Sequence, residues 1–129
     1  MKLLLPEEGS EEAAALWDEA HRITSSRLLY VEARAALAAA KRARRLRGTA
    51  LTRLRKRLDL RVGEVDIVEL SPAIAWLAGD VAEGYSLNTN DAIHLASAMS
   101  SAVAGQVFAT WDGALRGAAF QAGLAVAPS

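Results

Sequence analysis

"NTNDAIHLASAMSSAVAGQVFATWD", residues 88–112, decides the fold, because it joins a helical pattern directly to a strand pattern. The first part is apolar at helical spacing, which predicts a helix that ends near Gly105. "QVFATWD" then predicts a strand that ends in polar residues. Strands alternating with helices favour an α/β sandwich with a mostly parallel sheet.

The flanking sequence continues this alternation. "VEARAALAAAKRARRLR" predicts a helix that stops at Gly48, and "TALTRLRKRLDL" predicts a second basic helix. "VDIVEL" predicts a strand, and Ser71 with Pro72 marks the start of the next helix. The residues before the first of these helices, "RLLYVE", are expected to be extended, and residues 113–128 to form a short helix and a last strand.

Length and composition limit the class of protein. The chain has 129 residues, so we expect one domain over residues 1–129. It has no cysteine, which excludes disulfides and cysteine-ligated zinc and fits a cytoplasmic protein. No apolar run approaches the roughly 20 residues needed to cross a bilayer, so no membrane partner is expected.

Three carboxylates fall where elements meet. Asp112 ends a predicted strand, Glu32 ends the extended stretch before a helix, and Asp91 opens a helix. Ligands of open α/β sheets bind beyond the C-terminal ends of the strands. Carboxylates that converge there need a cation, and oxygen ligands without cysteine suit Mg²⁺ or Mn²⁺, which can activate water for phosphodiester hydrolysis.

Each residue also has a structural interpretation. Asp112 could be the N-cap of the following helix, and Asp91 could complement its helix dipole. Glu32 could be a first-turn acid or pair with Arg34. His94, on the same helix face as Asp91, is interpreted as a core-facing histidine with a structural hydrogen bond. The spacing of these residues alone leaves the function open.

The charge is unevenly distributed. Residues 41–57 contain nine of the fifteen basic residues and no acid, although the formal net charge is zero. This segment could bind RNA phosphates, or it could be a solvated face that pairs with an acidic partner. Leu51, Leu54 and Leu58 give the second basic helix a packing face. Trp17 and Trp76 are expected in the core, and Trp111 in the core or at its rim.

The motifs together resemble the PIN-domain family, specifically its VapC-type toxins. The segments that carry the resemblance are "KLLLPEEGSEEA", "SSRLLYVEARAAL", "NTNDAIHLASAM", "FATWDGAL" and "AAFQAGLAVAPS", and the last three motifs resemble the family in order and spacing. The resemblance implies a three-layer α/β/α fold and divalent-metal-dependent cleavage of RNA, with Mg²⁺ or Mn²⁺ as cofactor. It implies Glu32, Asp91 and Asp112 as catalytic metal ligands, with Thr110, Asn88 and Asn90 supporting them.

The resemblance also implies partners. These are an RNA substrate, a small cognate VapB-like antitoxin whose C-terminal segment enters the active-site groove, and a second copy of the chain in a homodimer. The candidate residues for RNA or partner binding are Arg42, Arg45, Arg53, Arg55 and Arg57.

The sequence departs from the family pattern at its start. The family begins with a central strand that ends in an acid, and this chain begins at "MKLLLPEE" without either. We therefore expect an N-terminally truncated PIN-like domain with impaired cleavage. We also expect compensation for the lost strand, by direct pairing of its neighbours, by a partner strand or by strand exchange in a dimer.

Two functions of different classes remain. One is a metal-dependent endoribonuclease toxin, and the other is a catalytically inactive PIN-like module that docks an antitoxin or RNA. A phosphate-dependent enzyme is disfavoured, because no glycine-rich phosphate-binding loop is present.

Overall fold

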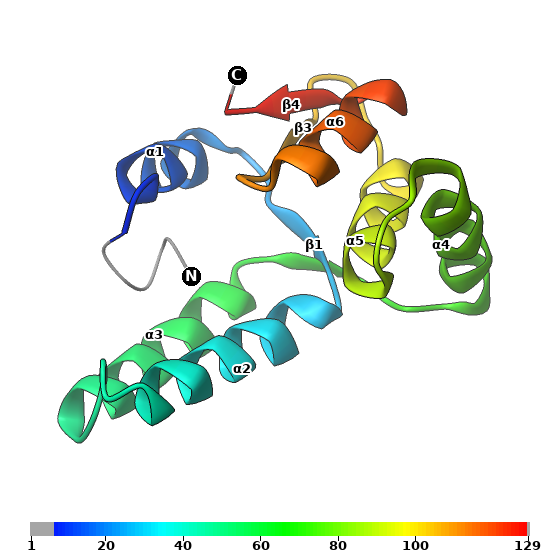
Figure 1. Cartoon of the computed structure of the whole chain (residues 1–129). Helices are drawn as coiled ribbons and strands as arrows, with labels where there is room; N and C mark the ends of the chain where they lie inside the picture. Colours follow the sequence, from blue (N-terminus) through cyan, green and yellow to red (C-terminus); the bar gives the residue numbers. More distant parts are fainter. Residues whose placement is uncertain (1–6, 129) are drawn as a thin grey trace. The chain divides into compact units, whose positions relative to one another are not determined.

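A computed structural model describes residues 7–128 (Figure 1). The elements follow in the order α1 (Ser10–Glu19), β1 (Thr24–Ser26), α2 (Leu28–Arg42), α3 (Thr49–Gly63), β2 (Asp66–Val68), α4 (Pro72–Tyr85), α5 (Thr89–Ser100), β3 (Val107–Ala109), α6 (Gly113–Gln121) and β4 (Ala125–Ala127). The chain forms two compact units, which are described separately. The α/β class predicted from the sequence is confirmed, whereas the single-domain assignment stays a prediction.

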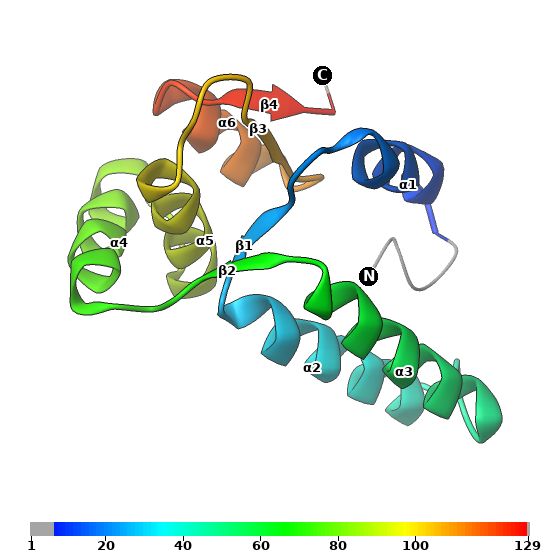
Figure 2. The ribbon, with the colours of Figure 1, turned by 180° about the vertical axis from the view of Figure 1, so that it is seen from behind.

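The first unit contains residues 7–23 and 27–66. Its main feature is a hairpin of α2 and α3, which run side by side in both views (Figures 1 and 2). Leu37 of α2 and Leu58 of α3 are buried against each other's helix. Leu51 and Leu54 pack on the same cluster, so the packing face predicted for the second basic helix is confirmed.

Two cation–π contacts add to this unit. The Arg61 guanidinium of α3 lies 5.0 Å from the centre of the Trp17 ring of α1. The Arg34 guanidinium lies 5.5 Å from the Tyr30 ring and donates a hydrogen bond to its hydroxyl oxygen at 3.0 Å. Trp17 is half-buried, so its position is at the edge of the core rather than inside it.

The second unit contains residues 24–26 and 67–128. Its core is formed by apolar residues on the facing sides of α4, α5 and α6: Ile74, Ala78, Val81, Ala92, Leu95, Ala96, Leu115, Ala118 and Ala119. Ser71 accepts a hydrogen bond from the Ile74 amide at 3.2 Å, and Pro72 occupies the first helical position. The helix start predicted at this position is therefore confirmed.

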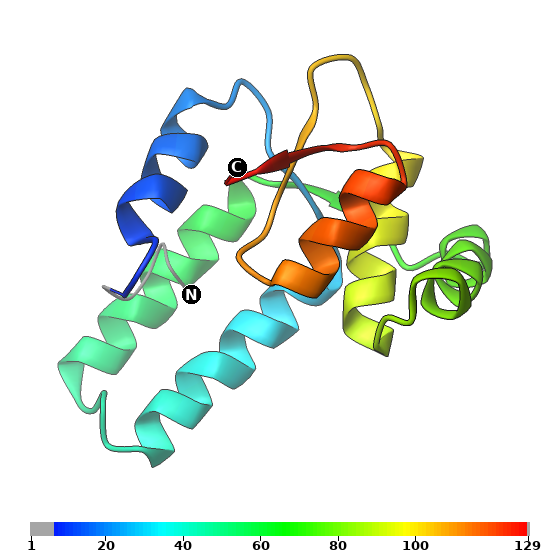
Figure 3. The ribbon, with the colours of Figure 1, turned by 45° about the horizontal axis from the view of Figure 1, so that its top comes forward.

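A β–α–β crossover forms the C-terminal part of the second unit. β3 and β4 are parallel, with Val107 paired to Ala125 and Phe108 to Val126, and α6 connects them (Figure 3). Parallel strands need such a crossover because a tight turn cannot join them. Phe108 and Val126 pack on the helical core, so the sheet holds its strand ends at a fixed place relative to α5 and α6.

The strands form two sheets within residues 7–128. β1 pairs with β2, and β3 pairs with β4, so each sheet has two strands. Asp66, the first residue of β2, donates its amide to the Ile23 carbonyl oxygen at 2.8 Å and forms an ion pair with Arg22. β1 and β3 do not pair with each other within the described residues, and the expected compensation for the missing strand stays a prediction.

Three local predictions need correction. The segment "LLYV" is the start of α2, and the strand before it is shorter and earlier, at Thr24–Ser26. The helix expected to reach Gly105 ends at Ser100, because Ser100, Ser101 and Gln106 side chains donate to carbonyl oxygens of its last turns. Trp76 lies on the outer side of α4 with 80% of its surface exposed, not in the core.

None of the helices within residues 7–128 is both long and apolar enough to cross a membrane.

Candidate functional site

Asp112 is held between β3 and α6 by two hydrogen bonds. Its amide donates to Thr110 Oγ1 at 3.1 Å, and its Oδ1 accepts from the Leu115 amide at 2.9 Å. The Thr110 amide in turn donates to the Ala127 carbonyl oxygen at 3.0 Å, which extends the pairing of β3 with β4. The exposed Asp112 carboxylate is therefore the N-cap of α6, and its position is set by the sheet.

Asp91 occupies the first turn of α5. Its amide donates to Asn88 Oδ1 at 2.9 Å, so Asn88 is the N-cap of this helix. Ala92, the next residue, and Leu95, one turn further along, are buried, which fixes the helix against the core. Asp91 is half-buried as a result, and Asn90 is exposed beside it.

The two aspartates belong to the same unit and share one structural context. Each lies in the first turn or at the cap of a helix, and α5 and α6 pack in the same core. In Figure 3 both helices begin on the lower side of the second unit. Oxygen donors from carboxylates, an amide and a hydroxyl fit Mg²⁺ or Mn²⁺ and do not fit a metal that prefers sulfur ligands.

Glu32 lies in the first unit. It is the fifth residue of α2 and is half-buried, so it is neither at the end of an extended stretch nor a first-turn acid. The reason is that Leu28 already begins the helix, which carries Glu32 one turn further in. The nearby Arg34 contacts Tyr30.

The three-carboxylate arrangement stays a prediction. Glu32 belongs to the first unit, and Asp91 and Asp112 belong to the second. Within either unit, the described residues contain no group of three or more His, Asp or Glu side chains that could hold a metal ion.

Comparisons with known proteins identify the family. The family model of the PIN domain matches residues 1–121. The chain belongs to the PIN-domain family. It is 41% identical over 129 residues to "Ribonuclease VapC45" of Mycobacterium tuberculosis (strain CDC 1551 / Oshkosh) and to "Ribonuclease VapC49" of Mycobacterium tuberculosis (strain ATCC 25618 / H37Rv). Each match covers 100% of this chain and 90% of the relative, which makes this PIN domain one of the VapC type.

The basic residues of this PIN domain gather on the helical hairpin of the first unit. Arg42 ends α2, Arg45 lies in the following turn, and both are exposed. Arg53 and Arg57 are exposed on α3. Arg55 is partly buried and forms an ion pair with Asp59 at 3.6 Å, which leaves it less suited to binding a partner than the other four.

His94 and the supporting polar residues have defined places. His94 lies in the middle of α5 and is half-buried; its structural hydrogen bond stays a prediction. The Thr110 hydroxyl accepts a hydrogen bond from the Asp112 amide, and the Asn88 side chain accepts one from the Asp91 amide. The capping role of Asn88 was missed in the sequence, although an asparagine just before a helical pattern is a recognised signal for it.

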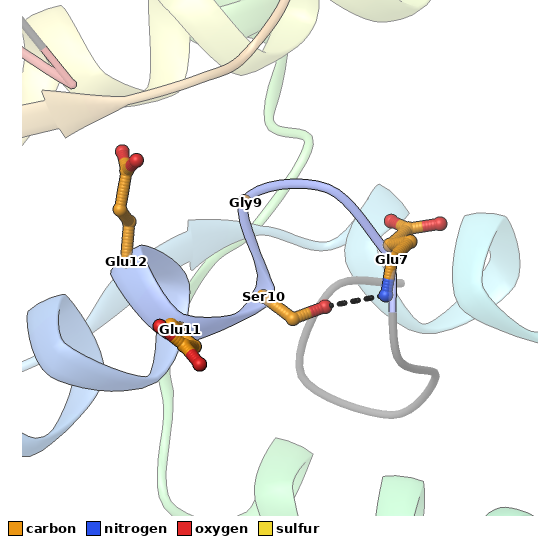
Figure 4. Close-up of a pocket in the computed structure, with 5 residues that line it drawn as sticks. All are labelled: Glu7, Gly9, Ser10, Glu11 and Glu12. Carbon is orange, nitrogen blue, oxygen red and sulfur yellow. Dashed lines mark hydrogen bonds between the residues drawn. The ribbon is translucent and has the colours of Figure 1, made fainter.

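A hollow of about 360 Å³ lies at the start of α1 in the first unit (Figure 4). It is lined by Glu7, Gly9, Ser10, Glu11 and Glu12. Ser10 Oγ accepts a hydrogen bond from the Glu7 amide at 2.9 Å, which shapes the turn before the helix. The three glutamate side chains point in different directions in Figure 4, so they do not form a site for one cation.

Proposed function

We propose that this chain is an endoribonuclease, the toxin component of a toxin–antitoxin pair. Two relatives that match over the whole chain are named ribonucleases. The observation that carries the proposal is the placement of Asp91 and Asp112, each positioned by its own cap hydrogen bond, at the starts of two helices that pack in one core.

Asp91, Asp112 and Glu32 are the residues that would hold a divalent cation, Mg²⁺ or Mn²⁺. Such a cation, when bound, polarises the phosphodiester and lowers the pKa of a bound water. The role of the chain is to place the carboxylates. Thr110 and Leu115 fix the Asp112 backbone and one carboxylate oxygen, and Asn88 fixes the Asp91 backbone. Asn90, exposed in the first turn of α5, is a further hydrogen-bonding group for water or RNA.

RNA contact is assigned to the hairpin of the first unit. Arg42, Arg45 and Arg57 are exposed cations on α2, on the turn and on α3. Arginine side chains bind phosphate through several N–H donors at once, and such contacts provide most of the sequence-independent affinity for RNA. Arg53 and Arg55 were also predicted to bind RNA or a partner. Arg53 is exposed, whereas Arg55 forms an ion pair with Asp59.

The partner is a small VapB-like antitoxin that neutralises the toxin by covering its site. An acidic segment of such a partner fits the same basic hairpin that RNA uses, so binding of one excludes the other. An RNA substrate and the absence of cysteine fit a cytoplasmic place of action.

The test is cleavage of a single-stranded RNA by the purified chain with Mg²⁺ or Mn²⁺. Asp91→Asn and Asp112→Asn should each lower the rate at least about a hundredfold, with full inhibition by a chelator. Glu19→Gln, an exposed acid at the end of α1, is the matched control and should leave the rate unchanged. If Asp91→Asn and Asp112→Asn cleave RNA as fast as Glu19→Gln and the unmodified chain, the proposal is refuted.

A second candidate is a PIN-like module that binds an antitoxin or RNA without cleaving. It is favoured by the finding that, among residues 7–128, neither unit alone contains three metal-binding side chains together. RNA binding that requires Arg42, Arg45 and Arg57, without cleavage under any metal condition, would support this candidate.

A further inference from the structure

Arg116 is the only lysine or arginine between residues 67 and 128. The second unit, to which residues 24–26 also belong, therefore contains a single permanent positive charge among its described residues. The same unit contains five acids: Glu69, Asp80, Glu83, Asp91 and Asp112. Because opposite charges attract, a lone cation in such a unit is expected to pair with one of these carboxylates unless another contact holds it elsewhere.

The Arg116 side chain is held by the backbone and not by a carboxylate. Its Nη1 donates a hydrogen bond to the Pro128 carbonyl oxygen at 3.2 Å, and within residues 7–128 the side chain forms no ion pair. A guanidinium group carries five N–H donors, so most of them remain for another acceptor. The half-buried side chain is already ordered by this contact, which lowers the entropy that it loses when it binds a ligand.

Arg116 lies at the same edge of the sheet as Asp112. β3 and β4 are parallel, so their C-terminal ends share one edge; Asp112 follows β3 and Pro128 follows β4. Arg116 lies four residues after Asp112, about 6 Å along the axis of α6, and its amide donates to the Asp112 carbonyl oxygen at 2.9 Å. Side chains on a helix lean toward its N-terminus, which directs the guanidinium back toward this edge.

This edge therefore carries two groups of opposite charge that do not neutralise each other. One oxygen of the Asp112 carboxylate accepts from the Leu115 amide, and no ion pair joins that carboxylate to Arg116. Asp112 can then bind a cation while Arg116 binds an anion. A guanidinium matches the oxygens of a phosphate with two parallel N–H donors. An RNA strand whose reacting phosphodiester lies at Asp112 has a further phosphate on either side of it.

We propose that Arg116 binds the RNA phosphate next to the one that is cleaved, and so fixes the strand relative to Asp112. This inference rests on the proposed function. It adds a phosphate contact in the second unit to those assigned to the basic hairpin, and it uses residues of the second unit only. Arg116 is a substrate-binding residue and takes no part in activating water.

The first test measures RNA binding in an Asp91→Asn background, which prevents cleavage. Fluorescence anisotropy with a labelled single-stranded RNA gives the Kd at several salt concentrations. Arg116→Gln should raise the Kd about tenfold and reduce the slope of log K against log salt concentration by about 0.7, as expected for one phosphate contact. Arg34→Gln is the matched control in the other unit, because Tyr30 holds the Arg34 guanidinium, and it should change neither value.

The second test separates phosphate binding from a structural role of Arg116 in holding Pro128. The probe is a set of RNAs in which one phosphate at a time is replaced by a neutral methylphosphonate. Replacement beside the cleavage position should weaken binding to the chain that has Arg116 and should not weaken binding to Arg116→Gln. The same profile for both chains, or an unchanged Kd and salt slope in the first test, would overturn the proposal and leave Arg116 to Pro128 or to an acidic protein partner.

The third test uses cleavage by the otherwise unmodified chain. Arg116→Gln should raise KM about tenfold and change kcat by less than about threefold, because a contact to a neighbouring phosphate is made equally before and during the reaction. A lower kcat with an unchanged KM would contradict the proposal. Cleavage with an unchanged KM would overturn the role of Arg116 alone, whereas no cleavage by the unmodified chain would count against the proposed function and leave the two binding tests to decide on Arg116.

Discussion

The Asp112 amide donates a hydrogen bond to Thr110 Oγ1 at 3.1 Å, and this contact ties a candidate metal ligand to the end of β3. Thr110 is itself anchored, because its amide donates to the Ala127 carbonyl oxygen of β4. The position of the carboxylate is therefore set by the pairing of the two strands and by α6 together. In a PIN domain this means that changes in the C-terminal strand reach the site through Thr110.

Thr110→Val should destabilise the chain and slow cleavage. Valine has nearly the shape of threonine but cannot accept the Asp112 amide proton, and a lost hydrogen bond of this kind costs about 1 kcal/mol. Urea unfolding measures the stability, and RNA cleavage measures the site. Thr52→Val is the control, since Thr52 lies on α3 in the other unit and its hydroxyl contact to Gly48 is long, at 3.5 Å. The idea fails if both variants slow cleavage equally.

Asp112 has two separable roles. Asp112→Asn should keep the N-cap, because asparagine caps as well as aspartate, and should abolish cleavage by removing the charge. Asp112→Ala should abolish cleavage and also lower the free energy of unfolding by about 1 kcal/mol. Ser71→Ala, which removes the corresponding cap of α4, should show the stability loss with normal cleavage. Normal cleavage by Asp112→Asn would leave Asp112 with a capping role alone.

Asn88 positions the backbone of Asp91 and is not itself expected to contact the metal. Asn88→Ala should cost about 1 kcal/mol of stability, whereas Asn88→Ser should keep the cap and most of the activity. Thermal unfolding and single-turnover cleavage distinguish these outcomes. If serine is as harmful to cleavage as alanine, then the Asn88 amide group has a direct role in the reaction.

The fold was predictable where local signals and packing agree. Ser71 and Pro72 begin α4 as the sequence indicates, and the leucines of α3 pack where their spacing places them. The β3–α6–β4 crossover also follows from the alternation of patterns. In each case the capping residue or the period of the apolar residues points to one structure only.

The errors arose where composition supports two structures. "LLYV" has a strand-like run of apolar residues, but Leu28 and Leu29 are good helix formers and continue into the alanine-rich α2. Trp76 was expected in the core, but its spacing from Asp80 and Glu83 puts it on the charged face of α4. The spacing of a residue from its charged neighbours, rather than its type, decides which face of the helix it occupies.

The candidate site shows the same limit. The sequence pointed to the ends of elements at which Asp91 and Asp112 lie, since caps and strand ends leave local signals. Local sequence patterns do not predict whether Glu32 lies near Asp91 and Asp112. These residues are about 60 or more positions apart in the chain, and a local pattern does not encode their relative position. The proposed metal site therefore depends on family membership for Glu32, whereas hydrogen bonds define where the two aspartates lie.

Leu95 should be the most sensitive apolar position of α5. It is fully buried among the residues of α4, α5 and α6, so Leu95→Ala removes packing and leaves a cavity at a cost of about 2–5 kcal/mol. Val103→Ala is the matched control, because Val103 is 69% exposed in the turn after α5 and should change stability by less than about 0.5 kcal/mol. Urea unfolding followed by circular dichroism compares the two, and similar midpoints would contradict the assignment of this core.

The basic hairpin should determine how RNA binding depends on salt. Each phosphate contact to single-stranded RNA contributes about 0.7 to the slope of log K against log salt concentration, so replacing Arg42, Arg45 and Arg57 by alanine should reduce the slope by about 2. Fluorescence anisotropy with a labelled RNA at several salt concentrations measures this, using an Asp91→Asn background to prevent cleavage. Arg34→Ala is the control, because the Arg34 guanidinium is held by Tyr30. An unchanged slope in the triple variant would assign these arginines to a protein partner instead, since the loss of three phosphate contacts must appear as fewer released counterions.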